Sequence, residues 1–177
     1  MKIIVVSDTH GNCDNLVRVM ETEKRADLLI HLGDLLCSPE EIKEIAGCPA
    51  QIIAGNNDFF SALDREKEFE IEGYKIFMTH GHKYQVGLGT SYLRDVAHKK
   101  GADIVMYGHT HRPEVSFYNQ LMILNPGSLT SPRQEGRMPS YITLWLDAKK
   151  GIDYDICYLD KLYHQKSMSI VRTSVKL

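Results

Sequence analysis

The stretch KIIVVSDTH, residues 2–10, decides the fold of this chain. Its first part, Lys2–Ser7, is a short apolar run bounded by polar residues, and such a run predicts a buried strand. Asp8 and His10 follow directly, where the strand ends. In open α/β sheets, ligands bind outside the carboxyl ends of the strands. The stretch therefore predicts a buried strand that presents a carboxylate and an imidazole at a ligand-binding edge.

Two further apolar runs, Leu28–Leu32 and Gln51–Ala54, predict a second and a third buried strand. Residues 12–24 carry apolar side chains at helical spacing, and a second helix is predicted to begin with Ser38 as its cap and Pro39 in its first turn. The first third of the chain thus alternates β-α-β-α-β. This pattern is typical of a parallel sheet with right-handed crossovers.

Strands dominate the rest of the chain. Glu68–Glu72 and Lys75–Thr79 flank a glycine and predict a hairpin, and a helix is predicted to begin at a Thr90 cap and to run to residue 99. Five more strands are predicted, at Ile104–Tyr107, Glu114–Tyr118, Leu121–Asn125, Tyr141–Leu146 and Ile152–Leu159. The basic tail after Asp160 is interpreted as a solvated last strand or a frayed terminus. We expect an α/β (α+β) fold: one domain over residues 1–177, with two packed sheets flanked by helices.

Metal-ligand-type residues follow five of the predicted strands. The candidates are Asp8, His10, Asp34, Asn56, His80, His109 and His111. A single Asp or His after a strand is more often a cap or a surface group, but five such motifs in register predict one convergent patch. The pairs Asp8-x-His10 and His109-x-His111 space two ligands at i and i+2, and in extended backbone such side chains share a face. We therefore expect each pair to act as a chelating arm.

The number and type of these candidates favour two metal ions. Seven ligands exceed one tetrahedral site and suit two ions that share a bridging carboxylate. The mixture of imidazole, carboxylate and amide oxygen fits Mn, Fe, Co, Ni or Zn rather than Ca. Two-metal sites of this kind support in-line displacement at phosphorus. The sequence therefore predicts a dinuclear phosphoesterase.

Composition excludes several other classes. The net charge is −2, from 21 basic and 23 acidic residues, so no basic excess favours a nucleic-acid partner. No apolar stretch approaches the length of a membrane span or of a secretory core. The four cysteines show no C-x-x-C spacing. We expect a cytoplasmic protein with reduced thiols and a small-molecule partner, and we leave a homo-oligomer open.

The complete motif series resembles the metallophosphoesterase (calcineurin-like phosphoesterase) superfamily, in particular its small bacterial and archaeal phosphodiesterase branch. The resemblance covers residues 2 to about 133, including the segment Asn125-Pro126-Gly127-Ser128. It implies a four-layer α-β-β-α sandwich and hydrolysis of phosphodiesters by a metal-bridging hydroxide, with manganese as the first choice of metal. It also implies two ligand sets that share Asp34 as the bridge: Asp8, His10, Asp34 and His111, then Asp34, Asn56, His80 and His109.

One position departs from the resemblance. Many members place a histidine that acts as an acid directly after the Gly-Asn pair, and here that position is Asn57. This departure favours substrates with acidic leaving groups such as aryl phosphodiesters. His82 is the alternative acid, so we assign catalytic roles to Asp34 and His82.

Four polar side chains are the expected substrate contacts. They are Asn12, Asn57, His82 and Arg133. Asn12 has a helix cap as its alternative role. Arg133 has an alternative as a solvated arginine. The loop Gly87-Leu88-Gly89 could cradle a phosphate or serve only as a connection.

Two alternatives to this enzyme stay open. One is a non-catalytic scaffold, because the superfamily includes a retromer subunit of similar size with a degraded metal site. That scaffold lacks a histidine at the position of His10, so the presence of His10 favours an enzyme. The other alternative is a nuclease, although a chain of 177 residues at net charge −2 has little room for DNA-contacting regions.

Overall fold

The computed structural model describes residues 1–59, 61–159 and 171–175. The helices are α1 (Asp14–Glu23), α2 (Pro39–Ala46) and α3 (Ser91–Lys99), with short 3-10 turns η1 (His82–Tyr84) and η2 (Val86–Leu88). The strands are β1 (Lys2–Val6), β2 (Leu28–His31), β3 (Ala50–Ile52), β4 (Glu66–Ile71), β5 (Tyr74–Thr79), β6 (Ile104–Met106), β7 (Pro113–Tyr118), β8 (Leu121–Pro126), β9 (Ser140–Asp147), β10 (Gly151–Tyr158) and β11 (Val171–Val175).

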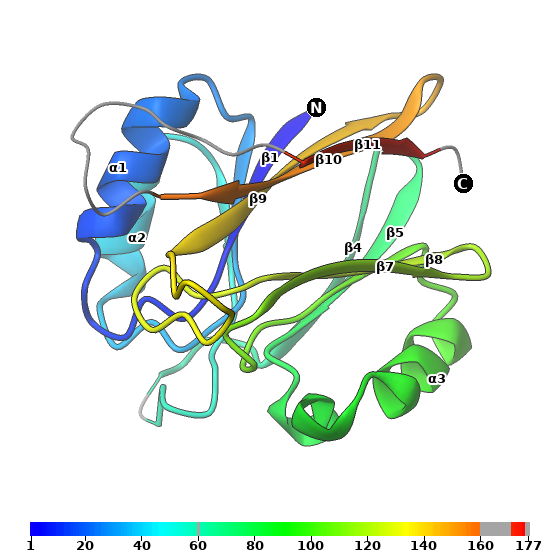
Figure 1. Ribbon diagram of the computed structural model, residues 1–177, viewed down its shortest axis with the longest axis horizontal. Coiled ribbons are helices and arrows are strands. Elements are labelled where there is room, and N and C mark those ends of the chain that lie inside the picture. The colour runs from blue at the N-terminus through cyan, green and yellow to red at the C-terminus, as the bar shows by residue number, and fades with distance from the viewer. Residues whose placement is uncertain (60, 160–170, 176–177) are drawn as a thin grey trace.

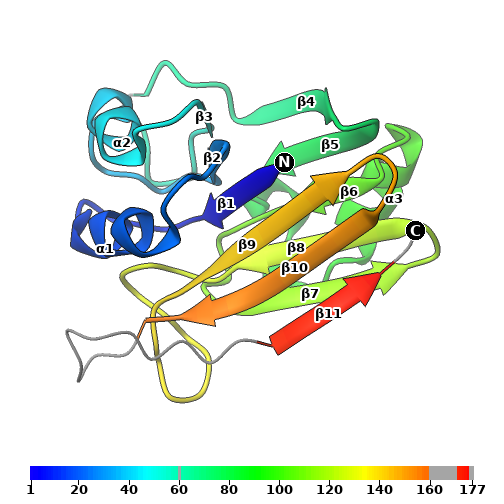
Figure 2. The same cartoon turned by 90° about the horizontal axis from the view of Figure 1, so that it is seen from above.

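The strands form two mixed sheets. The first has the order β11-β10-β9-β1-β2-β3, and Figure 2 shows its long strands side by side. Within it β1, β2 and β3 are parallel, as the β-α-β-α-β pattern predicts, whereas β9 and β10 are antiparallel. The second sheet has the order β4-β5-β6-β8-β7, with β5, β6 and β8 parallel. The parallel strands of each sheet place their carboxyl ends at one edge.

Three apolar clusters separate four layers. Ile3 and Val5 point into the cluster between the two sheets, where they meet side chains of β5, β6 and β8. Ile4 and Val6 alternate to the other face and pack against α1 and α2. A third cluster packs α3 against the second sheet. Figure 1 shows α1 and α2 beside one sheet and α3 beside the other, so the expected α-β-β-α sandwich is confirmed.

The helix starts agree with the sequence at one predicted cap and differ at the other. Ser38 Oγ accepts a hydrogen bond of 3.1 Å from the backbone N–H of Glu41. Thr90 occupies the position before α3, but its side chain makes no capping hydrogen bond with any described residue, so the predicted Thr90 cap is wrong in this respect. Its backbone φ of −96° and ψ of 3° lie outside the extended region that side-chain capping favours.

The C-terminal segment contributes a strand to the first sheet. Val171–Val175 pairs antiparallel with β10, which agrees with the last-strand interpretation for these residues. The rest of the basic tail, at 160–170 and 176–177, lies outside the described residues. Within the described ranges, the helices all lack the length and apolar character that crossing a membrane requires.

Candidate metal centre

The predicted ligands come together where the parallel strands of both sheets end. Asp8 follows β1, Asp34 follows β2 and Asn56 follows β3, while His80 follows β5 and His109 and His111 follow β6. Two groups have ligand atoms that all lie within 4.8 Å of one another, and each group could hold a metal ion. One group is Asp8, His10 and His111, and the other is Asp8, Asp34 and His80. Five of the seven candidates, from the ends of four strands, thus lie close together.

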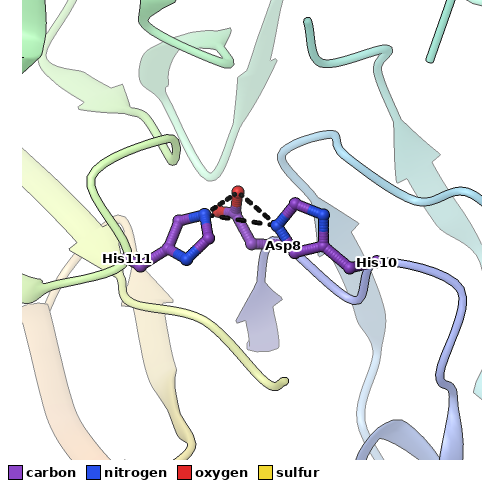
Figure 3. Close-up of side chains that lie close together, drawn as sticks. All are labelled: Asp8, His10 and His111. Carbon is purple, nitrogen blue, oxygen red and sulfur yellow. Dashed lines mark hydrogen bonds and ion pairs between the residues drawn. The ribbon is translucent and has the colours of Figure 1, made fainter. Parts of the chain in front are cut away.

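The first group is a compact triad (Figure 3). His111 Nε2 lies 3.0 Å from Asp8 Oδ1 and 3.2 Å from His10 Nε2. His10 Nε2 lies 3.7 Å from the same carboxylate oxygen. One carboxylate oxygen and two imidazole nitrogens thus lie close together, and each of these atoms can offer a lone pair to a metal ion.

Backbone carbonyls fix which nitrogen of each key histidine points into the centre. His111 Nδ1 lies 2.6 Å from Ser131 O, and His80 Nδ1 lies 2.7 Å from Leu32 O. A carbonyl oxygen only accepts, so Nδ1 carries the proton in both rings. The Nε2 atoms are thereby directed at the carboxylates as acceptors. This is the arrangement that orients imidazole ligands at metal sites.

The second group lies deeper. His80 Nε2 is 3.4 Å from Asp34 Oδ2 and 4.0 Å from Asp8 Oδ1. Across the described structure, neither His80 Nε2 nor Asn56 Oδ1 has a hydrogen-bond partner, although both atoms are buried. Buried polar atoms without partners are costly unless an ion or water satisfies them. These orphaned ligand atoms fit a divalent cation.

The pKa values of the two carboxylates and of His80 also show that this centre favours a bound positive charge. Burial alone would raise the pKa of Asp8, but its contact with His111 and the charge on His80 outweigh burial and hold this pKa below its usual value. Burial also raises the pKa of Asp34, yet His80 and Asn57 more than reverse that effect. For His80 burial lowers the pKa, and the two carboxylates raise it above the usual value. A proton or a metal cation can supply this positive charge.

Five of the seven predicted ligands have left-handed backbone conformations. Their φ angles are 58° at Asp8, 47° at His10, 54° at Asp34, 68° at His109 and 59° at His111. Such a conformation costs a non-glycine residue of order 1 kcal/mol and clusters at functional sites. The folded chain thus accepts strain at five ligand positions.

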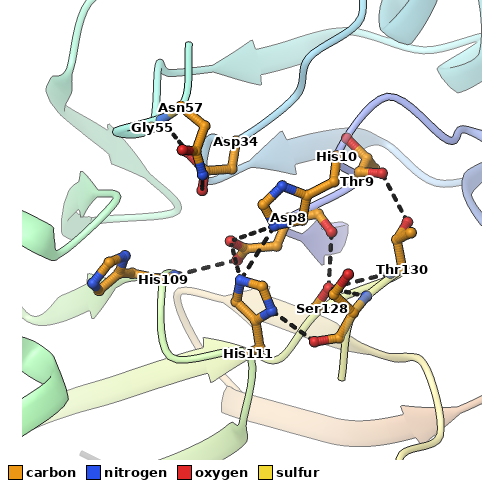
Figure 4. A network of polar contacts seen from close by, with 12 residues as sticks. Asp8, Thr9, His10, Asp34, Gly55, Asn57, His109, His111, Ser128 and Thr130 are labelled. Carbon is orange, nitrogen blue, oxygen red and sulfur yellow. Dashed lines mark hydrogen bonds and ion pairs between the residues drawn. The ribbon is translucent and has the colours of Figure 1, made fainter. Parts of the chain in front are cut away.

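These conformations correct the expectation that each i, i+2 pair lies in extended backbone. Asp8 and His10 still meet in the first group, but His109 and His111 separate. The His109 ring lies 5.3 Å from the His80 ring, on the other side of the centre from His10 (Figure 4). His111 thus belongs to one of the groups of close ligand atoms, whereas His109 belongs to neither.

Buried Asp58 holds two ligand loops together. Its carboxylate accepts hydrogen bonds from the backbone N–H groups of Leu35, Leu36 and Gly55, at 2.7–3.2 Å. It thus ties the loop of Asp34 to the loop of Asn56. Gly55 approaches so closely that an added Cβ would lie 2.1 Å from Asp34 Oδ1.

The segment after β8 joins the loops of the two sheets, and sequence reasoning missed this role. Ser128 Oγ donates to Asp8 O at 2.8 Å, and Asn125 Nδ2 donates to Gly108 O at 2.8 Å. Figure 4 shows Ser128 and Thr130 beneath the Asp8 loop. The motif Asn125-Pro126-Gly127-Ser128 carried the only sequence signal, and nothing in its spacing identified its partners.

The predicted substrate contacts fall into two kinds. Asn57 is already engaged, because its backbone N and its Nδ2 donate to the two carboxylate oxygens of Asp34 at 2.8 Å and 2.6 Å. Asn12 Oδ1 accepts from Asp14 N at 2.9 Å, so its side chain contacts the first residue of α1, but the N-cap position is Cys13 and not Asn12. The His82 ring lies beside the centre, 5.6 Å from the His80 ring. Arg133 lines a cavity that also includes His109.

His31 lies at the end of β2 and is fully buried. Its Nδ1 accepts from Gly33 N, and its Nε2 lies 3.1 Å from Thr9 Oγ1. Burial lowers the pKa of His31 to about 4, so the ring is neutral at pH 7. Its contact with Thr9 supports the loop between Asp8 and His10.

Comparisons with known proteins agree with this geometry. A family model of the calcineurin-like phosphoesterase superfamily domain matches residues 1–149. The chain belongs to this superfamily. The resemblance inferred from the motif series is thereby confirmed.

Relatives place the chain among small members of the superfamily. It is 34% identical over 156 residues to a probable metallophosphoesterase of Methanothermobacter thermautotrophicus, covering 85% of this chain and 88% of the relative. It is 33% identical over 146 residues to a phosphodiesterase of Methanocaldococcus jannaschii, covering 72% of this chain and 83% of the relative.

Among solved structures, the fold matches Vps29 of Entamoeba histolytica in complex with zinc, with a TM-score of 0.82 over 98% of both chains at 22% identity.

Proposed function

We propose that this protein is a dinuclear-metal phosphodiesterase. One observation carries the proposal: the Nε2 atoms of His80 and His111, directed by backbone carbonyls, face buried carboxylate oxygens of Asp8 and Asp34. A convergence of lone pairs and negative charge of this kind is suited to holding divalent cations. Membership of the superfamily supports hydrolysis of phosphate esters, and the relative from Methanocaldococcus jannaschii is a phosphodiesterase.

Two ions would be held by the seven predicted ligands. Asp8, His10 and His111 would contribute to one ion, and Asn56, His80 and His109 to the other. The resemblance assigns the bridge to Asp34, whereas the two groups of close ligand atoms share Asp8. Following the resemblance, Asp34 would serve as the bridge, and its contact with His80 and two hydrogen bonds from Asn57 would orient its carboxylate. Bound divalent transition metals lower the pKa of water and neutralise charge that builds on phosphoryl oxygens.

The side chains at positions 57 and 82 determine how acidic the leaving group must be. Asn57 replaces the acid histidine of many members, and its amide donates to Asp34. Burial, together with the charges on His80 and His109, lowers the pKa of His82 to about 4. A neutral imidazole is a weak acid at pH 7, so departure without full protonation is the mechanism that we assign. This favours aryl phosphodiesters.

Metal content and activity, measured on the same protein, test the proposal. The purified protein is analysed by inductively coupled plasma mass spectrometry, stripped with a chelator, and reloaded with Mn, Ni, Co, Fe, Zn or Mg. We expect about two ions per chain and hydrolysis of bis(4-nitrophenyl) phosphate only when a transition metal is present. Full activity of the stripped protein would overturn the dinuclear proposal.

The scaffold alternative has a fold-level likeness to Vps29 in its favour. We place it second because His10 is present and its Nε2 lies 3.2 Å from His111 Nε2. A protein that binds metal but hydrolyses no phosphodiester in the panel would favour the scaffold.

A further inference from the structure

A cavity of about 570 Å³ opens beside the metal centre on the side of His109. This volume falls in the range of small-molecule sites, roughly 300–1,000 Å³. Its lining includes Thr90, Tyr107, His109, Arg112, Glu114 and Arg133. His109 belongs to the cavity and to the centre alike, since its backbone N–H donates to Asp8 Oδ2 at 3.2 Å. A substrate phosphate at the metal centre would therefore place one of its ester groups in this cavity.

The cavity carries uncompensated positive charge. The guanidinium groups of Arg112 and Arg133 have no hydrogen-bond or ion-pair partner in the described part of the chain. The one acidic side chain in the lining, Glu114, accepts a hydrogen bond of 2.9 Å from the hydroxyl of Tyr107. The lining thus combines two arginines that have no partner among the described residues with one hydrogen-bonded carboxylate, and this favours an anionic occupant.

The segment Gly87–Gly89 adds space and an apolar rim. Gly87 has an ordinary φ, and an added Cβ would meet no described atom within 4 Å, so neither conformation nor packing demands a glycine there. Leu88 also lines the cavity and is 89% exposed. The N–H groups of Leu88 and Gly89 donate to Gln85 O and Val86 O. These amides are engaged, so of the two roles left open for the segment the structure favours the plain connection, which here provides room and an apolar surface.

We propose that the cavity selects phosphodiesters whose retained ester group bears a second anionic group, a carboxylate or a phosphate, bound by Arg112 and Arg133. The organic part of that ester group lies against Leu88. This inference rests on the proposed phosphodiesterase function and names its substrate class. It predicts that the second charge acts on binding, because that charge does not change in the reaction and the arginines would hold it equally in the bound substrate and in the transition state.

Three matched substrates test the selection. All share the 4-nitrophenolate leaving group, and the retained group is phenyl, 4-carboxyphenyl or 4-phosphonophenyl. We expect the wild-type protein to show a KM roughly tenfold lower for a charged substrate, with little change in kcat. The larger of the two gains identifies carboxylate or phosphate as the preferred group.

Variants assign the effect to the cavity. Arg112→Ala and Arg133→Ala should each remove most of the preference, and Arg112→Lys should retain part of it. Arg137→Ala, at an exposed position outside the lining, is the matched control. Gly87→Val should raise KM for all three substrates by occupying the open space. Calorimetry with the corresponding non-hydrolysable phosphonates measures the same preference without turnover.

The outcomes separate this inference from the proposed function. Equal KM values for the three substrates, or a preference that survives both arginine-to-alanine changes, would overturn the inference while leaving the phosphodiesterase intact. Absence of hydrolysis of every substrate by metal-loaded protein would overturn the proposed function. In that case, calorimetry still decides the inference, since tighter binding of the charged phosphonates that is lost in Arg112→Ala would support an anion-selective cavity.

Discussion

The two walls of the metal centre differ in chemistry and in how they are held. The wall from the first sheet supplies both carboxylates, Asp8 and Asp34, which are 0% and 1% exposed, together with His10 and Asn56. Hydrogen bonds to Asp58 hold the loops of Asp34 and Asn56. The wall from the second sheet supplies His80, His109 and His111. Two of these rings are aimed by carbonyl oxygens, one of them Leu32 O from the opposite wall.

One wall therefore supplies negative charge, and the other supplies ligands of fixed orientation. The acidic wall carries the negative charge that attracts cations, and depressed pKa values keep that charge present at neutral pH. Imidazole nitrogens are softer ligands than carboxylate oxygens, and their lone pairs have a fixed direction. The imidazole wall therefore favours transition metals over Ca or Mg. We therefore expect acid variants to change how many ions bind and imidazole variants to change which ions bind.

Removal of the ions should have the largest effect, because it leaves both walls without a partner. Chelation should reduce phosphodiester hydrolysis at least about 1,000-fold, and a transition metal should restore it. The thermal midpoint should also fall, since bound metal stabilises only the folded state. Parallel scanning calorimetry and hydrolysis assays measure both effects. An unchanged midpoint in the stripped protein would contradict the view that the walls require a cation.

The next prediction compares the walls directly. Asp34→Asn should lose at least one ion per chain and lower kcat about 100-fold or more, because a bridging carboxylate offsets repulsion between adjacent dications. His109→Gln should keep the stoichiometry but weaken metal affinity about 10- to 100-fold and alter metal preference. Glu21→Gln, at an exposed position of α1, is the control. Metal analysis across a concentration series measures these quantities, and equal stoichiometries in both variants would remove the distinction.

The sequence was sufficient to predict the walls but not their geometry. Strand positions and the convergence of Asp8, Asp34 and His80 followed from apolar runs and from the rule that parallel strands share a carboxyl edge. Left-handed backbone at His109 and His111 could not be predicted, because it depends on tertiary contacts that compensate its cost. The separation of this pair, in contrast, agrees with the two ligand sets that the resemblance implies.

The roles of Ser128 and Asp58 could not be predicted from the sequence, because both depend on long-range hydrogen bonds. Ser128 contacts Asp8 across 120 residues, and Asp58 contacts Leu35 across 23. Neither pairing has a local periodicity, so propensity and spacing carry no information about it. Arg112 escaped notice for the same reason, since only the fold places it with Arg133 in one cavity.

The contact between the walls can be tested at Gly108. An alanine Cβ there would lie 2.2 Å from Ser7 Oγ and 3.0 Å from Asp8 Oδ2. We expect Gly108→Ala to reduce the free energy of unfolding by roughly 1–3 kcal/mol and to weaken metal binding. Gly87→Ala, which meets no described atom within 4 Å, should leave stability unchanged. Urea titration compares the two variants. Equal stability would show that the loops around Gly108 can move enough to accommodate the added methyl group.

The support of the acidic wall can be tested at Asp58. Asp58→Asn keeps the shape but replaces one accepting oxygen by an NH₂ group that faces backbone donors. We expect a loss of about 1–3 kcal/mol in the free energy of unfolding and roughly tenfold weaker metal binding. Asp153→Asn, at an exposed position of β10, is the control. Unaltered metal affinity would mean that Asp34 is positioned without Asp58.

The smallest effect should come from His82, which lies beside the imidazole wall with a pKa of about 4. A ring that is neutral at pH 7 gives the leaving group little protonation, so rates should depend steeply on the acidity of the departing phenol. His82→Ala should then change the hydrolysis of 4-nitrophenyl diesters by less than about tenfold and leave that steep dependence intact. A series of aryl phosphodiesters with graded phenol pKa values measures the slope for both proteins. A shallow slope in the wild type that steepens in His82→Ala would instead make His82 the acid, and the imidazole wall would then supply a proton as well as ligands.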